Sequence, residues 1–323
     1  MSLLITKPTG RRTRDAHDFG KVAVLLGGDS SEREISLLSG NAVLAALIRR
    51  GVDARAFDPR DRPVCELASG GFDRAWIALH GPGGEDGLMQ GALEWLGVPY
   101  TGSGVLASAL TMDKLKTKRV VVGADLLAPD YAVLASAADL PRALERIGLP
   151  LMIKPASQGS SVGITKVKTA EELPRAYAEA SAVDSIVFAE TFIRGPEYTV
   201  GVLHDRGLPS IRIEPATEFY DYEAKYFRDD TQYHCPSGLD AAAEAELQAA
   251  ALATFRVTDC WGWGRVDFMR DAATGKFFFI EINTTPGMTD HSLVPKAARQ
   301  IGIDFEELVW RVLETSFLRE RKK

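Results

Sequence analysis

An apolar run that ends in two glycines constrains the fold of this chain more than any other feature of its sequence. Residues 22–26 read Val-Ala-Val-Leu-Leu and lead directly into Gly27-Gly28. A strand that is apolar on both faces must be covered on both, and this is typical of a parallel sheet flanked by helices. Residues 75–79 form a second apolar run of the same kind. We therefore expect the N-terminal third to be a doubly wound α/β unit.

A helix is expected between these two strands. Ser31-x-x-Glu34 has the spacing of a capping box, apolar residues follow at roughly helical intervals, and Gly51 supplies a C-terminal stop. Residues 113–147 are also predicted to be helical, whereas short strands separated by glycine turns begin near residue 149.

These changes of pattern divide an α/β (α+β) chain into segments. We predict a flexible leader at 1–20, an N-terminal domain at 21–117, a central domain at 118–199 and a C-terminal domain at 200–323. The last includes a polar, aromatic stretch at 218–235 whose length and lack of periodicity favour a lid over the site.

Composition excludes several classes of protein. The chain has 323 residues, and its 38 Lys+Arg against 44 Asp+Glu give a net charge of −6, which argues against a nucleic-acid binder. Its three cysteines are far apart and show no metal-binding spacing. The chain has no apolar stretch of the ~20 residues that a membrane span needs. We expect a cytoplasmic protein without a membrane partner.

A glycine-rich loop between two strand patterns is a candidate phosphate site. Residues 158–163 read Gln-Gly-Ser-Ser-Val-Gly, with Lys154 just upstream. Exposed amides and hydroxyls in such a loop suit a triphosphate, although a plain hairpin turn has the same composition. The loop lacks the Walker spacing and opens no helix.

The strongest constellation lies near the C-terminus. Arg265 and Asp267 alternate onto one face of a strand, Glu281 and Asn283 do so on the next, and a turn-like segment joins the two. Two carboxylates and an amide on one sheet face suit Mg²⁺, which prefers hard oxygen ligands. The alternative is a salt bridge of Arg265 with a carboxylate on a solvated face.

Other candidates surround this cluster. Gly287 lies in the following hydroxyl-rich loop, where its N–H suits a developing oxyanion. Lys225 and Tyr226, in the expected lid, suit a phosphate contact and a hydrogen bond. Of the five histidines, only His80 sits where an α/β sheet presents ligands.

These segments together resemble the D-alanine–D-alanine ligases of the ATP-grasp superfamily, in the family's order from about Lys21 to Leu318. The matching segments are Leu-Leu-Gly-Gly28, Ser-Glu-Arg-Glu-Ile-Ser36, His80-Gly-Pro-Gly-Gly-Glu-Asp-Gly87, Tyr-Thr-Gly-Ser-Gly104, Met-Asp-Lys114, Lys154-Pro with Gly-Ser-Ser-Val-Gly163, Phe-Tyr-Asp-Tyr-Glu-Ala-Lys-Tyr226, Gly-Trp-Gly-Arg-Val-Asp267 and Glu281-Ile-Asn-Thr-Thr-Pro-Gly-Met-Thr289.

The resemblance implies a three-domain ATP-grasp enzyme that forms a homodimer and uses ATP to join two D-alanines for peptidoglycan synthesis. It implies that Asp267, Glu281 and Asn283 hold two Mg²⁺ ions, which Mn²⁺ can replace. Lys114, Lys154 and Lys225 would contact phosphates, beneath the loop of Ser160 and Ser161. Glu190 and Ile193 would line the adenine pocket, and Glu197 the ribose.

The resemblance also implies the substrate sites. Glu32, near His80, would receive the first substrate's ammonium, and Ser292 and Leu293 with Arg265 the second substrate's carboxylate. Arg265 and Gly287 would stabilise the oxyanion, and Glu32, Ser160 and Tyr226 would form a hydrogen-bonded triad linking the domains.

One departure from the family is Thr191, where many relatives carry a lysine beside the adenine. The alternatives that stay open are a D-Ala-D-Ser or D-Ala-D-lactate ligase, an ATP-grasp ligase of other substrates, and a non-catalytic ATP-binding module. Family comparison links Tyr226 with an amine nucleophile, which ranks D-lactate low.

Overall fold

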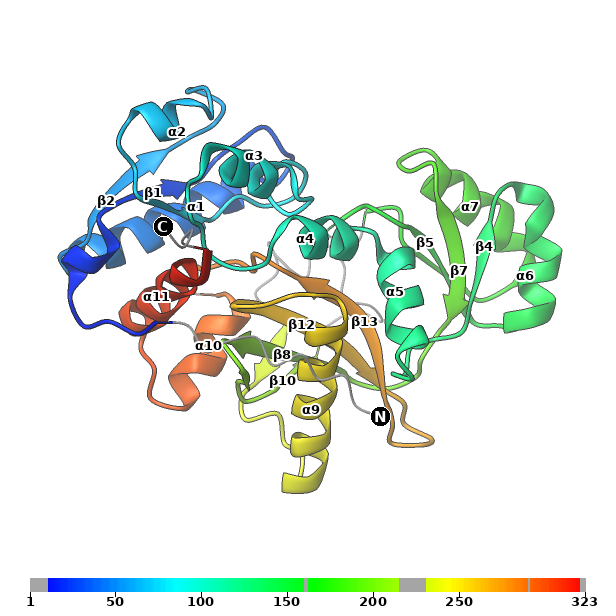
Figure 1. The fold of residues 1–323 in the computed structure, drawn as a ribbon. Coiled ribbons are helices and arrows are strands. Elements are labelled where there is room, and N and C mark those ends of the chain that lie inside the picture. The colour runs from blue at the N-terminus through cyan, green and yellow to red at the C-terminus, as the bar shows by residue number, and fades with distance from the viewer. Residues whose placement is uncertain (1–10, 160–161, 215–230, 290, 320–323) are drawn as a thin grey trace.

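The N-terminal sheet is parallel, as the sequence predicts. The computed structural model describes residues 11–159, 162–214, 231–289 and 291–319. The three strands of this first sheet are ordered β2-β1-β3 (Figure 1). They and the accompanying helices are β1 (Lys21–Leu25), α1 (Arg33–Arg49), β2 (Asp53–Phe57), α2 (Glu66–Ser69), β3 (Arg74–Ile77) and α3 (Leu88–Leu96).

Helices cover both faces of this sheet. Val22 and Val24 of β1 pack in one hydrophobic cluster with residues of α1, while the alternating Ala23 and Leu25 pack in another with residues of α2 and α3. Both faces of the strand are therefore buried, which is why its sequence is a continuous apolar run.

The expected capping box is wrong. Helix α1 begins at Arg33, and its N-cap is Glu32 rather than Ser31. Ser30 holds the preceding loop, because its hydroxyl donates to the His80 carbonyl at 2.7 Å and accepts from the Glu32 N–H at 3.2 Å. This loop therefore places Glu32 beside the carboxyl ends of β1 and β3.

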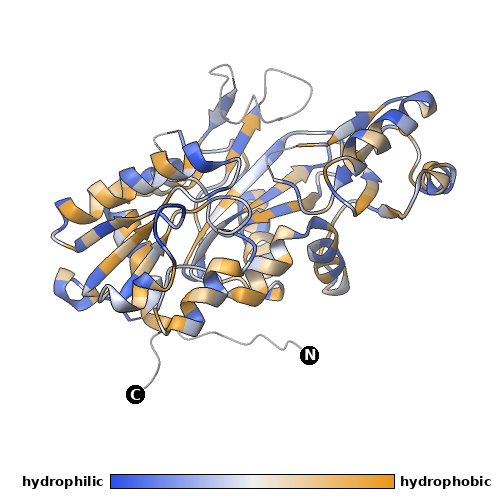
Figure 2. Cartoon of the chain, turned by 90° about the horizontal axis from the view of Figure 1, so that it is seen from above, coloured by the Kyte–Doolittle hydropathy of each residue, from blue (hydrophilic) through white to orange (hydrophobic). Residues whose placement is uncertain are grey.

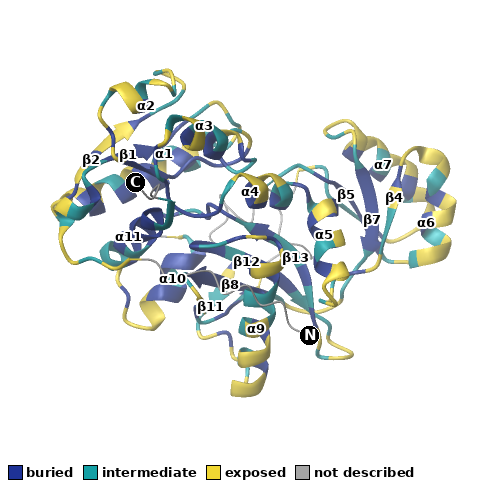
Figure 3. Cartoon of the chain, in the orientation of Figure 1, coloured by how far each residue is buried: buried dark blue, intermediate teal, exposed yellow. Residues whose placement is uncertain are grey.

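The central sheet is antiparallel, in the order β4-β7-β5-β6. Helices α6 and α7 cover it on its outer side, where Figure 3 shows their exposed faces, and α4 and α5 lead into it from the N-terminal domain. The elements are α4 (Val105–Met112), α5 (Lys114–Gly123), β4 (Tyr131–Leu134), η2 (Ala137–Asp139), α6 (Leu140–Ile147), β5 (Leu151–Pro155), β6 (Thr165–Val167), η3 (Ala170–Glu172), α7 (Leu173–Ser181) and β7 (Val187–Thr191).

Strand β4 interrupts the stretch 113–147 that the sequence pattern predicts as helical. This strand is short and mostly unburied at the edge of its sheet, so it lacks the alternating pattern of a half-buried strand. The predicted domain limit at residue 117 falls within α5, and the limit at residue 199 falls within β8, which pairs with β12 of the third sheet.

In the described ranges, the third sheet contains six strands, all paired antiparallel, with the path β11-β10-β8-β12-β13 and β9 against β8. Helix α9 packs across it. Figure 2 shows that helices of the molecule carry both hydrophilic and hydrophobic residues along their length. The elements are β8 (Glu197–Leu203), β9 (Arg206–Gly207), β10 (Ile211–Glu214), β11 (Gln232–His234), α9 (Ala241–Val257), β12 (Trp263–Arg270), β13 (Phe277–Asn283), α10 (Leu293–Gln300), α11 (Phe305–Glu314) and η4 (Thr315–Arg319).

The first and last thirds of the chain share one core. Residues of β1 and α1 belong to the same hydrophobic cluster as residues of α10 and α11. The indole rings of Trp76 on β3 and Trp263 on β12 lie 5.3 Å apart. The loops that follow β3 and β13 are therefore held against one another.

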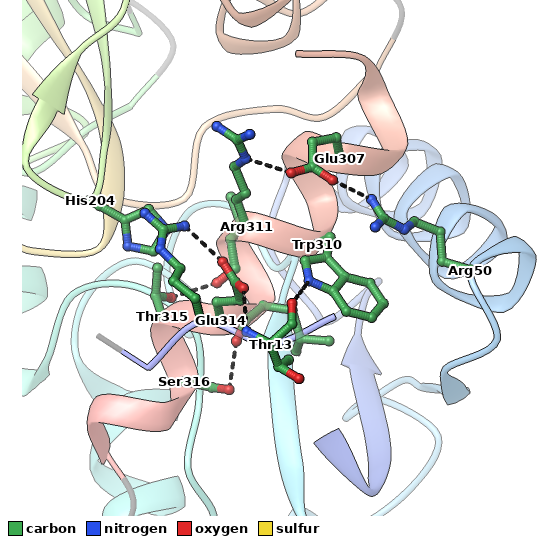
Figure 4. A network of polar contacts seen from close by, with 12 residues as sticks. Thr13, Arg50, His204, Glu307, Trp310, Arg311, Glu314, Thr315 and Ser316 are labelled. Atoms are coloured by element: carbon green, nitrogen blue, oxygen red, sulfur yellow. Dashed lines mark hydrogen bonds and ion pairs between the residues drawn. The ribbon is translucent and has the colours of Figure 1, made fainter. Parts of the chain in front are cut away.

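The prediction of a flexible leader at 1–20 is wrong for residues 11–20, because they dock on α11. The Thr13 N–H donates to Glu314 at 2.9 Å, and Trp310 Nε1 donates to the Thr13 carbonyl at 3.1 Å (Figure 4). Phe19, in η1 (Ala16–Phe19), is fully buried against Trp310 and Phe317. Leader residues 1–10 lie outside the described residues.

Arg12 secures this segment through a buried carboxylate. Its Nη1 donates to Glu314 Oε2 at 2.7 Å and lies 2.8 Å from His204 Nε2. Burial, reinforced by the Arg12 charge, lowers the pKa of His204 to about 4, so its imidazole is neutral and can accept from Arg12 near neutral pH.

Arg12→Ala is expected to lower the free energy of unfolding by about 1 kcal/mol, because Glu314 loses a charged donor that is itself half exposed and solvent-screened. Urea unfolding at neutral pH measures the change. Arg14→Ala is the matched control, because it removes the same charge from an exposed arginine two residues further along the chain. Equal stability of the two variants would contradict the proposed anchoring.

Candidate active site

The hairpin of β12 and β13 places the two predicted polar pairs on one face, as the sequence predicts. Arg265 lies opposite Asn283, and Asp267 lies opposite Glu281. Directly opposed residues of an antiparallel pair project from the same side of the sheet. The register shifts between Asp267 and Phe268, just beyond the polar pairs.

Asp267 is almost fully buried and has a complete set of donors. Arg265 donates to both carboxylate oxygens, Nε to Oδ1 at 2.9 Å and Nη2 to Oδ2 at 2.8 Å. Thr199 on β8 donates to Oδ1 at 2.6 Å, and Asn283 to Oδ2 at 3.2 Å. The salt bridge considered as an alternative to metal binding is therefore present, but it lies in a buried setting and not on a solvated face.

Glu281 has the counter-charge that its apolar strand requires. Lys114, the first residue of α5, places Nζ 3.3 Å from Glu281 Oε2 and donates to the Gln158 carbonyl at 2.7 Å. Lys114 thus joins the metal-ligand candidates to the start of the glycine-rich loop.

The donor set fits Mg²⁺ in its chemistry. The hard oxygen ligands would come from Asp267, Glu281 and Asn283. The two carboxylates are each paired with a cationic side chain, Asp267 with Arg265 and Glu281 with Lys114. No group of three or more His, Cys, Asp or Glu side chains with metal-binding geometry occurs among the residues that the structure describes. Asn283 is an amide, so the proposed ligand set contains only two residues of these four types and would not form such a group.

A cavity of about 500 Å³ gathers most of the predicted substrate residues. Its walls come from the loops after β1, β3 and β13, from the β12–β13 hairpin and from the starts of α5 and α10. The predicted residues that line it are Glu32, His80, Lys114, Arg265, Glu281, Asn283, Gly287, Ser292 and Leu293.

Two glutamates line the cavity near His80. Glu32 and Glu85 are both among its lining residues, and the Nε2 of His80 lies 3.3 Å from Ser39 Oγ. Burial lowers the pKa of His80 although the Glu32 charge opposes this, so His80 is a neutral hydrogen-bonding group near neutral pH. An ammonium group is therefore favoured beside these carboxyl groups.

The start of α10 and Arg265 also line the cavity. Ser292 is the N-cap of α10, and its Oγ accepts the Thr289 N–H at 2.9 Å. A Cβ at Gly287 would come within 2.9 Å of that same oxygen, so only glycine fits there without a shift. The first amides of α10 and the Arg265 guanidinium favour a carboxylate beside them.

Glu85 is a site residue that sequence reasoning missed, although it lies in one of the segments that carry the family resemblance. It accepts the Gly81 N–H at 2.9 Å and lies 3.1 Å from Thr285 Oγ1. Burial, together with the Glu32 charge, raises the pKa of Glu85 to about 7. The sequence contains no pattern that distinguishes a glutamate whose carboxyl group is buried from one that is exposed to solvent.

Glu85→Gln is expected to flatten the pH dependence of stability. The folded carboxyl keeps its proton up to about pH 7, whereas the unfolded one loses it near 4.5, so stability falls as the pH rises between these values. The wild-type protein should lose up to about 3 kcal/mol more than the variant between about pH 5 and pH 8.

Urea unfolding at the two pH values measures the difference. Glu246→Gln, which changes an exposed glutamate on α9, is the control and should retain the wild-type slope. A Glu85→Gln variant whose stability falls as steeply as that of the wild type would refute the assignment.

The cavity also contains residues that the sequence analysis did not propose: Thr231, Tyr233, His291 and Lys296. Lys296 lies one helical turn after Ser292 on α10, and its Nζ stands 4.3 Å from the centre of the Tyr233 ring. The spacing of four residues from Ser292 is the signal that would have found Lys296.

The predicted nucleotide residues lie on the central sheet and at its exit. Lys154 on β5 forms an ion pair with Glu190 on β7. Ile193 follows β7, and Glu197 is the first residue of β8. None of these four lines the cavity described above, nor does Asp267, which Arg265 holds within the hairpin.

Four of the predicted site residues, Ser160, Ser161, Lys225 and Tyr226, lie outside the described residues, as do positions 218–230 of the predicted lid. Gly159, the residue before Ser160 and Ser161, is described. A Cβ at Gly159 would lie 3.6 Å from Glu32 Oε2, so this loop reaches Glu32 at the cavity.

Comparison with known proteins reveals close relatives over nearly the whole chain. A family model described as D-ala D-ala ligase C-terminus matches residues 122–314. The D-alanine–D-alanine ligase of Alkalilimnicola ehrlichii is 57% identical over 95% of this chain and 98% of its own length. That of Dechloromonas aromatica is 58% identical over 92% and 97%.

Solved structures agree with these relatives. The D-alanine–D-alanine ligase from Bacillus anthracis complexed with ATP has a TM-score of 0.80 and 33% identity, covering 92% of this chain and 97% of that one. The VanG D-Ala:D-Ser ligase from Enterococcus faecalis has a TM-score of 0.80 and 30% identity, covering 92% and 99%.

Proposed function

The chain belongs to the D-alanine–D-alanine ligase family of ATP-grasp enzymes, and from this membership we propose that it joins two D-alanine molecules through an acyl phosphate. It is an ATP-dependent ligase. A carboxylate is a poor electrophile, so the first D-alanine must be phosphorylated by ATP before an amine can attack it.

The first step is a problem of positioning and charge. Lys114 and Lys154 offset the negative charge of the transferring phosphoryl group, with Lys225 and the loop of Ser160 and Ser161 as further contacts. Asp267, Glu281 and Asn283 would hold two Mg²⁺ ions, or Mn²⁺ in their place. Such ions supply charge stabilisation at the terminal phosphates when bound.

In the second step the unprotonated amine of the second D-alanine attacks the carbonyl carbon of the acyl phosphate. The C–N bond forms, the C–O bond to the phosphate breaks, and inorganic phosphate and one amine proton are released. Arg265 and the Gly287 N–H stabilise the tetrahedral oxyanion, and each such donor is typically worth about 2.7–4 kcal/mol. Glu32 and His80 receive the ammonium of the first substrate. Ser292 and Leu293 receive the carboxylate of the second. Glu32 with Ser160 and Tyr226 completes the triad that links the domains.

The observation that carries this function is the set of charged and polar groups that line one cavity. Glu32 and Glu85 suit an amino acid's ammonium, Arg265 and the start of α10 suit a carboxylate, and Glu281 and Asn283, two of the three metal-ligand candidates, line the same cavity. We further propose that Glu190, Ile193 and Glu197 bind the nucleoside part of ATP, with a backbone contact at Thr191.

The setting of the protein is also proposed. A cytoplasmic homodimer that supplies peptidoglycan precursors follows from the family resemblance. Within the described part of the chain, no helix is both long and apolar enough to traverse a membrane.

The test is a screen of D- and L-amino acids for ATP-dependent phosphate release, followed by the mass of the product. D-alanine alone should stimulate release and yield the dipeptide. Release without any amino-acid dependence would favour a non-catalytic or unrelated ATP-binding protein.

A competition of D-alanine with D-serine and D-lactate at neutral pH separates the related ligases. The likeness to a D-Ala:D-Ser ligase makes D-serine the second candidate. Mainly D-Ala-D-lactate or D-Ala-D-Ser product would overturn the choice of D-alanine.

A further inference from the structure

A buried carboxylate on the central sheet is shared by two lysines, and only one of them has a role in the proposed reaction. Glu190 Oε1 contacts Lys154 Nζ, and Glu190 Oε2 lies 2.9 Å from Lys118 Nζ. All three side chains are at most 10% exposed. Lys118 lies on α5, four residues after Lys114. One helix therefore supplies a lysine to Glu190 and another to Glu281.

These buried ion pairs are expected to contribute little to the stability of the fold. Removing charges from water costs several kcal/mol per ion, and a buried pair often contributes less than apolar residues of the same volume. Glu190 Oε2, at 2.9 Å, is the one carboxylate that pairs with Lys118 Nζ among the described residues, and no other hydrogen bond to this ammonium is present there. The contact with Glu190 therefore has to offset the burial of Lys118 by itself.

The charges have a functional consequence. Burial would raise the pKa of Glu190, but Lys118 and Lys154 outweigh burial and lower it to about 2, so the carboxylate is ionised. Burial lowers the pKa of Lys118, and the Glu190 charge and hydrogen bond oppose this. With both lysines protonated, the three groups carry a net positive charge. A polyphosphate that approaches Lys154 must compete with Glu190 for it.

We propose that Lys118 is a positioning residue for nucleotide binding: it neutralises Glu190 and so releases Lys154 to contact the phosphates of ATP. This inference rests on the proposed function, which assigns Lys154 to the phosphates. When Lys154 turns to the nucleotide, Lys118 keeps Glu190 from being left as an unpaired buried charge.

The first test is Lys118→Met, which keeps the length of the side chain and removes its charge. Glu190 then holds Lys154 as its single counter-ion. The affinity for ATP, measured calorimetrically without D-alanine, should fall by about 10- to 100-fold, the range of a hydrogen bond to a charged group. Adenosine, which has no phosphates, should bind as tightly as to the wild type.

The ligand pair separates positioning from structural damage. A deformed pocket would weaken ATP and adenosine together, and that result would overturn the proposal. Lys116→Met is the matched control, since Lys116 lies on the same helix, is more than half exposed and pairs with Asp113. It should retain the wild-type affinity for ATP.

A second variant keeps the proposal testable if Lys118→Met does not fold. In Lys118→Met with Glu190→Gln the pair is neutral, and Lys154 has no carboxylate to hold it. Because Glu190 is also proposed to bind the nucleoside, the readout is the ratio of ATP affinity to adenosine affinity. This ratio should recover at least part of the loss seen in the single variant or, where that variant does not fold, should lie within about tenfold of the wild-type ratio. No recovery would refute the competition for Lys154.

Different results would contradict the proposed function and the role of Lys118. A wild-type protein that shows no D-alanine-dependent phosphate release contradicts the proposed function. A wild type that is active while Lys118→Met binds ATP as tightly as the wild type contradicts the role of Lys118 alone.

Discussion

Asp267→Asn is expected to reduce kcat by about 10³-fold and to leave the fold intact. The amide keeps the shape of the carboxylate and can still accept from Thr199, but it removes the charge that orients Arg265 and that would bind a divalent cation. Removing one electrostatic group of this kind commonly lowers kcat by about 10²–10³-fold. Asp267 is expected to support two such groups, the Arg265 guanidinium and a divalent cation.

Steady-state phosphate release at saturating ATP, D-alanine and Mg²⁺ measures the effect, and circular dichroism checks the fold. Asp271→Asn is the control, because Asp271 lies in the exposed turn of the same hairpin and bonds only within it. A variant of Asp267 with wild-type turnover would remove the basis for the metal assignment.

Arg265→Lys should lower kcat by about 10²-fold with little change in the KM for ATP. Lysine keeps the charge, but its single ammonium cannot reproduce the two parallel contacts to Asp267. The cation is then displaced from the oxyanion that it is proposed to stabilise, and such stabilisation depends on fixed donors.

The same assay measures kcat and both KM values for this variant. Arg270→Lys is the control on the same strand, where the guanidinium contacts the Gly275 carbonyl at 3.1 Å and the Phe277 ring. If Arg265→Lys changed the KM for ATP and left kcat intact, Arg265 would belong to nucleotide binding and not to the oxyanion.

The local parts of this site could be predicted from the sequence. The alternation of Arg265 with Asp267 and of Glu281 with Asn283, joined by a short turn, is sufficient to place all four on one face, and the structure confirms their register. The apolar run at 22–26 likewise predicts a parallel strand buried on both faces. A period of two residues determines the face of a strand without reference to any distant residue.

Errors arose where a contact with a distant element decides the outcome. Residues 11–20 contain no strong pattern, and they are ordered because Glu314 and Trp310, far along the chain, supply their partners. The edge strand β4 is set by its pairing with β7 rather than by its own alternation.

The sequence by itself determined the family, the order of the elements and which side chains share a strand face, because these depend on local periodicity and on motifs in a fixed order. Only the tertiary structure decided which charges meet in the interior: Lys114 with Glu281, Lys118 and Lys154 with Glu190, and Glu85 beside Glu32. The energy of a buried charge depends on neighbours brought from other elements, and no spacing within one segment encodes them.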